Sequence, residues 1–366
     1  MLDLTIKATW MRGGTSKCWV FERQELEQDA MSMDDILLRA FGSPDERQLD
    51  GVGGGTSTTS KAVILNPYKG DDYDVNYLFA QVGIEEPVVD WGSNCGNCSS
   101  VAALYAIENG WITPQDGVTT VRVYNENTGQ GIVQQIATPG GKLPAATSEM
   151  VGSVYPGIQV NVGFEDPAGK TTGKLFPVDE PCTYIEVDGA NYPVTLIDAG
   201  APCVYLDAAA LGLTNHTREE WTTVIDAHLD LLDNIRRQGA VLMGLAETPE
   251  AAARAIPKLG IVGKTDIEKA DLRVQMLSMG KCHPAMPVTG SVALTLAARY
   301  SGTTIANVLG KTTQAGVDLD TPSGLLNTFA TDINHLPVVG ISRTCRTIAN
   351  TVIYVPLSPL PTEVAK

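Results

Sequence analysis

Short apolar runs, bounded by glycine, proline and small polar residues, recur along the chain and predict β-strands. Several of these runs alternate apolar with polar residues, which is typical of strands that bury one face. Some successive runs, such as 118–124 and 132–136, are joined by short segments with turn residues, which favours a largely antiparallel arrangement. We expect strands at positions 5–9, 19–21, 62–65, 77–82, 118–124, 132–136 and 184–187.

Helical patterns are fewer, and capping residues mark where they begin and end. Ser32 precedes an apolar run that stops at Gly42, and Thr217 precedes a longer pattern that Gly239 should terminate. Proline at the second position of Thr248-Pro249-Glu250 is typical of a first helical turn. We therefore expect helices from 33 to 41, at 101–108, at 218–237, from 249 onward and at 292–300.

A faint internal repeat links the two halves of the chain. Met11–Phe21 and Leu196–Leu206 are both strand–glycine–strand units, and a segment of small residues opens each of the helices 101–108 and 292–300. The spacings agree roughly, at 200 − 14 = 186 and 290 − 96 = 194 residues. The repeat predicts two similar α/β lobes that face each other across a cleft, although helix starts built from small residues are also common in unrelated chains.

Composition restricts the possible binding partners more than it restricts the possible reactions. A net charge of −16 argues against nucleic acid and anionic membrane surfaces, but not against a small anionic ligand in a locally basic site. We expect no membrane span and no signal peptide, since no apolar run has the required length or context. Seven scattered cysteines in 366 residues favour free thiols in a reducing cytoplasm.

The starts of helices are natural binding sites for carboxylates, because their first N–H groups lack helical partners and the helix dipole is positive there. Cys95 stands at such a start, in the polar segment Ser93–Asn97. The dipole should stabilise a thiolate, so we expect a lowered pKa for Cys95. A lone cysteine can also be a small buried apolar residue, but the neighbouring asparagines and glycine weaken that interpretation.

Cys95 and Cys98 also form a C-x-x-C pair, which raises the questions of metal and of redox chemistry. A zinc site needs two further ligands at suitable spacing. The histidines form no such cluster: His216, His228, His283 and His335. We therefore expect no metal, and a redox role for Cys98 stays open.

The segment Gly51–Lys61 is rich in glycine and hydroxyl side chains and ends on a single lysine. It does not match the phosphate-binding loop, because no glycine precedes Lys61 and Ala62 follows it. The segment could fix one ammonium group at the mouth of a cleft, or it could be a surface loop with a solvated lysine. The residues alone leave both interpretations open.

Taken together, the motifs resemble those of the PrpF family. They are spread over nearly the whole chain: Met11–Lys17, Phe41–Asp45, Asp50–Lys61, Asn94–Asn97, Leu277–Lys281 with His283, Pro322–Gly324, and Ser342-Arg343 with Arg346. The resemblance implies the diaminopimelate-epimerase-like fold of two similar lobes, each a mostly antiparallel sheet around a central helix, with the active site in the cleft between them. We expect the lobes at 1–182 and 183–345, and a strand in 346–366 that returns to the first lobe.

The resemblance also implies a chemistry. Family members include 2-methylaconitate cis–trans isomerase, 3-methylitaconate Δ-isomerase, 4-oxalomesaconate tautomerase and aconitate Δ-isomerase, which move a proton in an unsaturated polycarboxylate without a cofactor. The residues of the Lys61 loop and of Leu277–Lys281 are most similar to those of the 2-methylaconitate branch. A homodimer or homotetramer is expected. The acid–base pair of the family maps onto Lys61 and Cys95. The expected substrate-binding residues are Arg12, Ser16, Lys17, Thr59, Ser60, Ser93, Asn94, Gly96, Asn97, Met279, Lys281, His283, Thr289, Gly290, Ser291, Ser323 and Arg343.

Three departures from the family pattern, at Cys18, Cys98 and Thr321, bear on the substrate rather than on the reaction class. Two other functions remain to be weighed. A cofactor-independent amino-acid epimerase would need a second thiol, yet the nearest cysteine in the second half, Cys282, precedes the helix start. A non-catalytic partner of an aconitase-like enzyme would need no acid–base pair, so the retention of both Lys61 and Cys95 argues against it.

Overall fold

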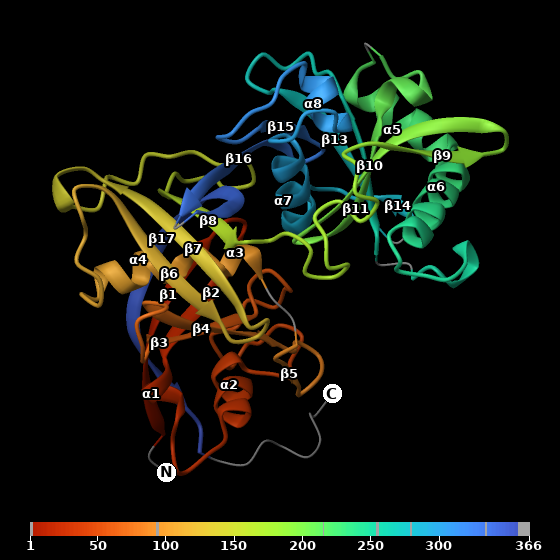
Figure 1. The fold of residues 1–366 in the computed structure, drawn as a ribbon. Coiled ribbons are helices and arrows are strands. Elements are labelled where there is room, and N and C mark those ends of the chain that lie inside the picture. The colour runs from red at the N-terminus through yellow and green to blue at the C-terminus, as the bar shows by residue number, and fades with distance from the viewer. Residues whose placement is uncertain are drawn as a thin grey trace. The chain divides into compact units, whose positions relative to one another are not determined.

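The computed structural model describes residues 3–92, 95–214, 216–253, 256–278, 280–333 and 335–357. The chain forms two compact units, Met1–Val162 with Arg343–Lys366 (unit 1) and Gly163–Ser342 (unit 2). These bounds differ from those expected from the sequence, 1–182, 183–345 and 346–366. The fold is mixed α/β and dominated by strands (Figure 1), as expected in outline.

Unit 1 holds the first part of the chain. Its elements are β1 (Leu4–Gly13), β2 (Ser16–Glu22), α1 (Arg23–Leu26), α2 (Met33–Phe41), β3 (Lys61–Pro67), β4 (Val75–Val82), β5 (Val89–Asp90), α3 (Gly96–Ser99), α4 (Val101–Glu108), β6 (Gly117–Asn125), β7 (Gln130–Thr138) and the 3-10 turn η1 (Pro139–Gly141). Two long strands, β8 (Ile158–Glu165) and β17 (Leu336–Val355), have residues in both units. The last part of β17 pairs with β1, from Gly13 opposite Cys345 to Leu4 opposite Val355.

Unit 2 holds the remaining elements. They are β9 (Thr183–Val187), β10 (Ala190–Ala199), β11 (Ala201–Asp207), η2 (Ala208–Leu211), α5 (Arg218–Ala227), α6 (Leu229–Leu242), η3 (Pro249–Ala251), β12 (Lys258–Gly263), β13 (Leu272–Ser278), β14 (Lys281–Cys282), α7 (Val288–Ala297), α8 (Thr304–Leu309), β15 (Asp318–Thr321) and β16 (Gly324–Ile333).

The two units share one order of strand pairings. In unit 1, β1–β2 is antiparallel, β2–β3 parallel, β3–β4 antiparallel, β4–β6 parallel and β6–β7 antiparallel. In unit 2, the pairs β10–β11, β11–β12, β12–β13, β13–β15 and β15–β16 repeat these senses in the same order. The sequence repeat thus corresponds to a repeat of topology.

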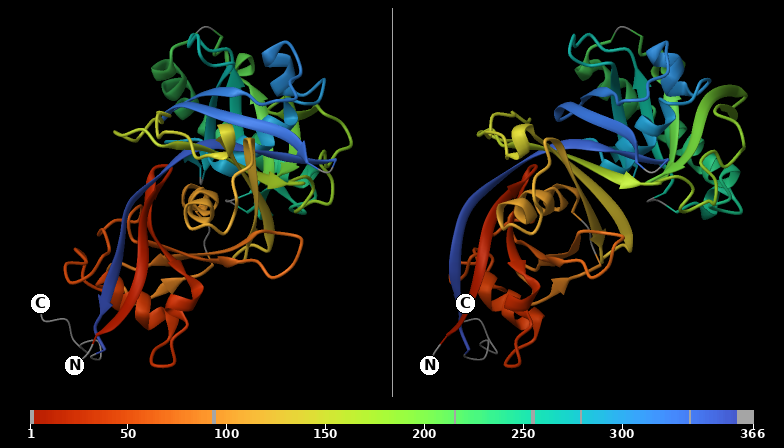
Figure 2. Two further views of the ribbon diagram at one scale, coloured as in Figure 1. Left: turned by 90° about the vertical axis from the view of Figure 1, so that its left-hand side faces the viewer. Right: turned by 60° about the vertical axis from the view of Figure 1, so that its left-hand side comes forward.

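Helix α4 is the buried centre of unit 1. Its residues 101–107 are all buried, and it packs against β1, β4, β6 and β7; Figure 2 shows it end-on among these strands. Gln134 on β7 ties the strands to the helix, because its side chain accepts from the Ala103 N–H and donates to the Ser99 carbonyl, at 2.9 and 2.7 Å. Both groups lie in the interior, where an unpaired polar group would be costly. A separate cluster packs α2 against β4 and β5.

Helices cover the sheet of unit 2 on two sides. The α7 cluster includes Tyr205, Met276 and Leu294, whereas Trp221 of α5 and Ile235 of α6 belong to a second cluster. Successive residues of a strand point to opposite faces, so Tyr205 and its neighbours in β11 belong alternately to the two clusters. Each fully buried large apolar side chain contributes on the order of 1.5–3 kcal/mol.

Three helix predictions need correction. The single helix expected over 218–237 is two helices, because the chain leaves helical geometry at His228, where φ is −116°. The His228 ring lies 2.7 Å from the Val224 carbonyl oxygen and satisfies one of the last carbonyl groups of α5. The helix expected from Pro249 is only the short turn η3. The helix expected at 292–300 begins and ends earlier, at Val288 and Ala297.

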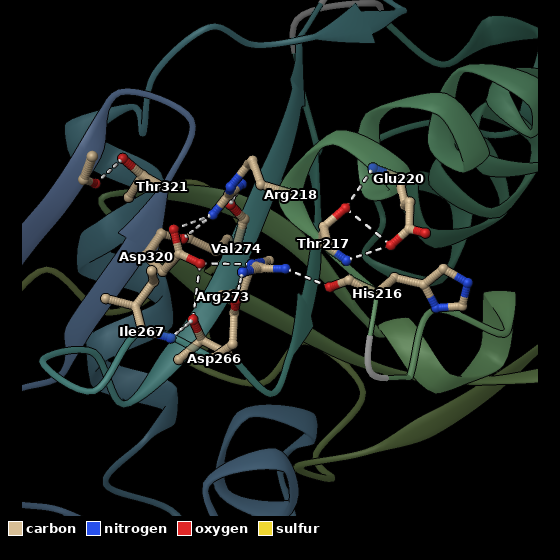
Figure 3. Close-up of polar contacts among 12 residues, drawn as sticks. His216, Thr217, Arg218, Glu220, Asp266, Ile267, Arg273, Val274, Asp320 and Thr321 are labelled. Atoms are coloured by element: carbon tan, nitrogen blue, oxygen red, sulfur yellow. Dashed lines mark hydrogen bonds and ion pairs between the residues drawn. The ribbon is translucent and has the colours of Figure 1, made fainter.

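A buried ionic cluster joins β13 to β15 in unit 2 (Figure 3). The carboxylate of Asp320 accepts from Arg273 Nε at 2.6 Å and from Arg218 Nη2 at 2.7 Å, and Thr265 Oγ1 donates to it at 2.9 Å. Arg273 also pairs with Asp266. Burial acts to raise the pKa of Asp320, but the two guanidinium groups outweigh it and hold that pKa below its ordinary value.

Candidate functional site

The glycine turn between β1 and β2 packs directly on the start of α3. A Cβ at Gly13 would lie 2.4 Å from the Asn97 carbonyl oxygen, and one at Gly14 would lie 2.2 Å from Asn97 Oδ1. Gly14 also has a φ of +54°, a conformation that favours glycine. The Asn97 side chain is fixed by Thr15 Oγ1 at 3.1 Å and by Arg343 Nε at 3.0 Å. The two glycines thus allow the close approach that places Asn97.

Cys95 is the N-cap residue of α3, as the sequence predicts. Its Sγ accepts a hydrogen bond from the Cys98 N–H at 3.4 Å. The expectation of a lowered pKa is wrong, however: the pKa of Cys95 is raised far above its ordinary value. The hydrogen bond with the Cys98 thiol is the largest cause and burial the next, and together they outweigh the stabilisation of a thiolate by the Lys61 ammonium. A four-residue helix offers too weak a field to reverse this balance.

Three thiols gather at this helix start. Cys98 is fully buried, and its thiol interacts through hydrogen bonds with the thiols of Cys95 and Cys18. Burial holds the pKa of Cys98 well above the ordinary value. All seven cysteines of the chain are unpaired. Within the described ranges, no group of three or more His, Cys, Asp or Glu side chains is arranged to hold a metal ion.

Lys61 begins β3, and its side chain is buried, so the alternative of a solvated surface lysine is wrong. Its Nζ donates to Gln81 Oε1 at 2.6 Å and lies 5.0 Å from the centre of the Phe79 ring. Gln81 is held in turn by the Ser60 carbonyl at 2.7 Å. Because its ammonium lowers the pKa of Cys95, Lys61 lies within electrostatic reach of that thiol.

Sequence reasoning missed Gln81. The signal was present, because Gln81 is a polar residue in an apolar strand, directly opposite Lys61 in the β3–β4 register. Only the pairing of the two strands reveals that it faces the lysine.

The hydroxyl groups of the loop before Lys61 are engaged within the loop and its neighbours. Ser60 is buried and donates to the Val82 carbonyl at 2.9 Å, while Gln48 Nε2 donates to Ser60 Oγ at 2.8 Å. Thr59 Oγ1 lies 2.7 Å from Thr56 Oγ1. These bonds shape the turn that delivers Lys61 to the start of β3.

Basic side chains and a buried hydroxyl lie near the glycine turn. Arg12 Nη1 donates to the Gly14 carbonyl and to Thr344 Oγ1, at 3.0 and 2.9 Å, and burial lowers the pKa of Arg12. Burial also lowers the pKa of Arg343, to about 10, so it remains protonated at neutral pH. Ser16 is buried opposite Gly13 in the hairpin register, and Lys17 Nζ lies 4.4 Å from the centre of the Trp10 ring.

In unit 2, three predicted residues form the first turn of α7. Thr289 Oγ1 accepts from Lys258 Nζ at 2.8 Å, and the Gly290 carbonyl accepts from the Tyr205 hydroxyl at 2.6 Å. Ser291 is buried and donates from Oγ to the Val288 carbonyl.

The other predicted residues of unit 2 are more dispersed. Lys281 is exposed in β14, and the backbone N–H of His283, just after it, donates to the Met276 carbonyl at 2.8 Å. Ser323 lies in the turn between β15 and β16, where its Oγ is 3.1 Å from Thr321 Oγ1. Ser93, Asn94 and Met279 lie outside the described residues.

Unit 1 therefore brings together a buried lysine, a helix-capping thiol and two guanidinium groups. Gly96 opens α3 directly after the thiol, next to Asn97. A thiol can donate a proton, the nitrogen of a lysine can exchange one, and guanidinium groups are suited to binding carboxylates.

Comparison with known proteins places these residues in a family context. The chain matches the family described as PrpF protein over residues 3–356. It is 37% identical to the 2-methyl-aconitate isomerase of Shewanella oneidensis and 34% identical to that of Cupriavidus necator, each over 90% of both chains. It is also similar to a crystal structure of methylitaconate-delta-isomerase, with a TM-score of 0.88 and 27% identity over the full length of both chains. No helix in the described part of the chain is long and apolar enough to cross a membrane.

Proposed function

The chain belongs to the PrpF family, and on that premise we propose that it is a cofactor-independent isomerase that shifts a proton within a small unsaturated di- or tricarboxylate. Lys61 and Cys95 are its acid–base pair. The observation that carries this assignment is their mutual placement: a buried lysine whose charge acts on a half-buried thiol at a helix start. Unlike groups in such an arrangement suit the removal and return of a proton at two different atoms.

The raised pKa of Cys95 favours the neutral thiol and so makes Cys95 the proton donor. Lys61 first releases a proton to solvent, and its free amine then takes the allylic proton, whose acidity is increased by the adjacent carboxylate. This leaves a delocalised anion on the substrate, and the Cys95 thiol returns a proton at the other end of the allylic system. The resulting ammonium and thiolate reset by proton transfer through solvent. Because the two groups interact, their protonation is a property of the pair.

The carboxylates of the substrate need cations and N–H donors. Arg343 and Arg12 are charged at neutral pH and stand beside Asn97 and the glycine turn, so they are proposed to orient one carboxylate near the acid–base pair. We also propose that the two units are the two epimerase-like lobes of this family's fold, which their common pairing order supports. The unpaired thiols suit a reducing compartment such as the cytoplasm.

Proton exchange with solvent is the direct test. Each candidate acid (2-methylaconitate, aconitate, methylitaconate and oxalomesaconate) is incubated with the enzyme in heavy water and followed by NMR. Lys61→Ala and Cys95→Ala should each lose deuterium incorporation almost completely. Lys142→Ala and Cys182→Ala, which change an exposed lysine and a cysteine of unit 2, should retain it. Near-native incorporation by either variant of the pair would remove that residue from the mechanism.

The structure disfavours the amino-acid epimerase. Such an enzyme needs a second thiol, but the N-cap of α7, which corresponds to the position of Cys95 at α3, is Pro287. Cys282 is set apart from that helix start, and burial beside Asp226 raises its pKa to about 12. A non-catalytic binding role predicts no proton exchange with any acid in the panel. Exchange with any of these acids would therefore exclude that role, and its absence would favour it.

A further inference from the structure

Lys258 occupies the place in unit 2 that Lys61 occupies in unit 1. In unit 2, Cys203 of β11 pairs with Lys258, the first residue of the parallel strand β12. In unit 1, Trp19 of β2 pairs with Ala62 of the parallel strand β3, the residue directly after Lys61. Each lysine thus begins the third strand in the same order of pairings. The repeat predicted from the sequence did not include this pair, whose separation of 258 − 61 = 197 residues follows from the register.

The Lys258 side chain turns toward the start of α7. Its partner in the register, Cys203, belongs to the apolar cluster around α7, and residues paired across a sheet share a face. Lys258 Nζ accordingly reaches Thr289 Oγ1, in the second residue of α7, at 2.8 Å. Burial raises the pKa of Cys203 to about 12, and the Lys258 ammonium acts in the opposite direction, which places its charge on this face.

This ammonium makes no ion pair within the described residues. The ion pairs found there do not include Lys258, although the chain carries 42 acidic residues. The first turn of α7 has no acidic side chain, and the N-cap Pro287 has no side-chain capping bond. An ammonium group has three protons to donate, and the Thr289 hydroxyl accepts one. A half-buried cation in this state is suited to an anionic ligand.

We propose that Lys258 and the first turn of α7 form a carboxylate-binding site within unit 2, suited to a polycarboxylate. The proposal rests on the proposed function for the class of ligand. The carboxylate would accept from the remaining ammonium protons and from the first N–H groups of α7, which have no partner within the helix. Lys258 binds rather than exchanges protons, because Pro287 stands where α3 carries Cys95. The lysines at these two equivalent positions are thus proposed to differ in role, acid–base in unit 1 and anion binding in unit 2.

Binding and turnover can be measured separately. Tricarballylate, a saturated tricarboxylate that cannot be isomerised, is titrated calorimetrically into the full-length enzyme and its variants. Lys258→Met should weaken binding about tenfold to a hundredfold, the effect of a lost charge-assisted hydrogen bond. Lys258→Arg should restore most of the affinity, and Lys264→Met, at an exposed lysine just after β12, should leave the affinity unchanged.

The outcomes separate this inference from the proposed function. Unchanged tricarballylate binding by a folded Lys258→Met variant overturns the role of Lys258, even if Lys61 and Cys95 behave as proposed. Tight, Lys258-dependent binding without proton exchange in the wild type supports Lys258 and overturns the isomerase. If the methionine variant does not fold, Lys258→Gln, which keeps a donor toward Thr289, is measured in its place and must show the same loss.

Discussion

Replacement of Gly14 by alanine should lower both stability and activity. The structure gives two separate causes for the loss of stability, one in the backbone and one in a steric overlap. Alanine at a φ of +54° costs about 1–2 kcal/mol from backbone conformation alone. The new Cβ would also lie 2.2 Å from Asn97 Oδ1 and 2.8 Å from its Cγ, an overlap that costs about 1–3 kcal/mol to relieve. The expected loss in the free energy of unfolding is therefore roughly 2–5 kcal/mol.

Gly140→Ala is the matched control, because Gly140 has a φ of +66° but open space where its Cβ would be. It should lose only the backbone share, about 1–2 kcal/mol. Urea denaturation of both variants gives the difference, and proton exchange in heavy water gives the activity. Gly14→Ala should lose most activity while still folded, since Asn97 must move away from Thr15 and Arg343. Equal stabilities of the two variants, with full activity in both, would refute the idea that the glycine turn positions Asn97.

Three further predictions follow from the site and its surroundings. Iodoacetamide, which reacts with thiolates, should alkylate Cys95 at pH 7 more slowly than free cysteine, and more slowly still in Lys61→Met, because the cation that lowers the pKa of Cys95 is gone. Gln81→Leu removes the hydrogen-bond acceptor of Lys61 and should lower kcat about tenfold or more in steady-state assays. Asp320→Asn should lower the free energy of unfolding by about 3 kcal/mol at pH 7, because it leaves the buried Arg273 with one partner fewer. The folded-state pKa of Asp320 is depressed, so its contribution is present above the unfolded value of about 4 and is lost as the pH falls through the folded value; the difference between the two proteins in urea denaturation should shrink as the pH is lowered below about 4.

Each of these has its own control. Alkylation at Cys282, followed by peptide mass spectrometry in the same samples, should not respond to Lys61→Met, and an equal or faster rate at Cys95 would contradict the electrostatic assignment. Gln159→Leu changes an exposed glutamine and should leave kcat unaltered. Asp332→Asn removes a more exposed ion pair with Arg299 and should cost much less stability than Asp320→Asn; equal costs for the two variants would show that the buried cluster is not stabilising.

Local signals in the sequence were reliable where a short segment decides its own structure. Ser32 and Gly42 do cap α2, and Thr217 forms a capping box with Glu220, since each of these contacts spans three or four residues. The helix at 101–108 was predicted to the residue. Where distant segments intervene, prediction was less accurate: α5 and α6 separate at His228, so that both can place apolar side chains on one cluster beneath them.

By itself, the sequence determined the chemistry available to this protein: a thiol at a helix start, a lysine at the head of a strand and a repeated strand–turn–strand unit. Only the tertiary structure decided how those groups behave. The pKa of Cys95 rises rather than falls because Cys98 and the surrounding interior lie against it, and strand pairing alone sets Gln81 opposite Lys61. The equivalence of Lys258 with Lys61 likewise follows only from the register of β11 and β12. Solvation and the charge around a group depend on residues far away along the chain, which no local pattern records.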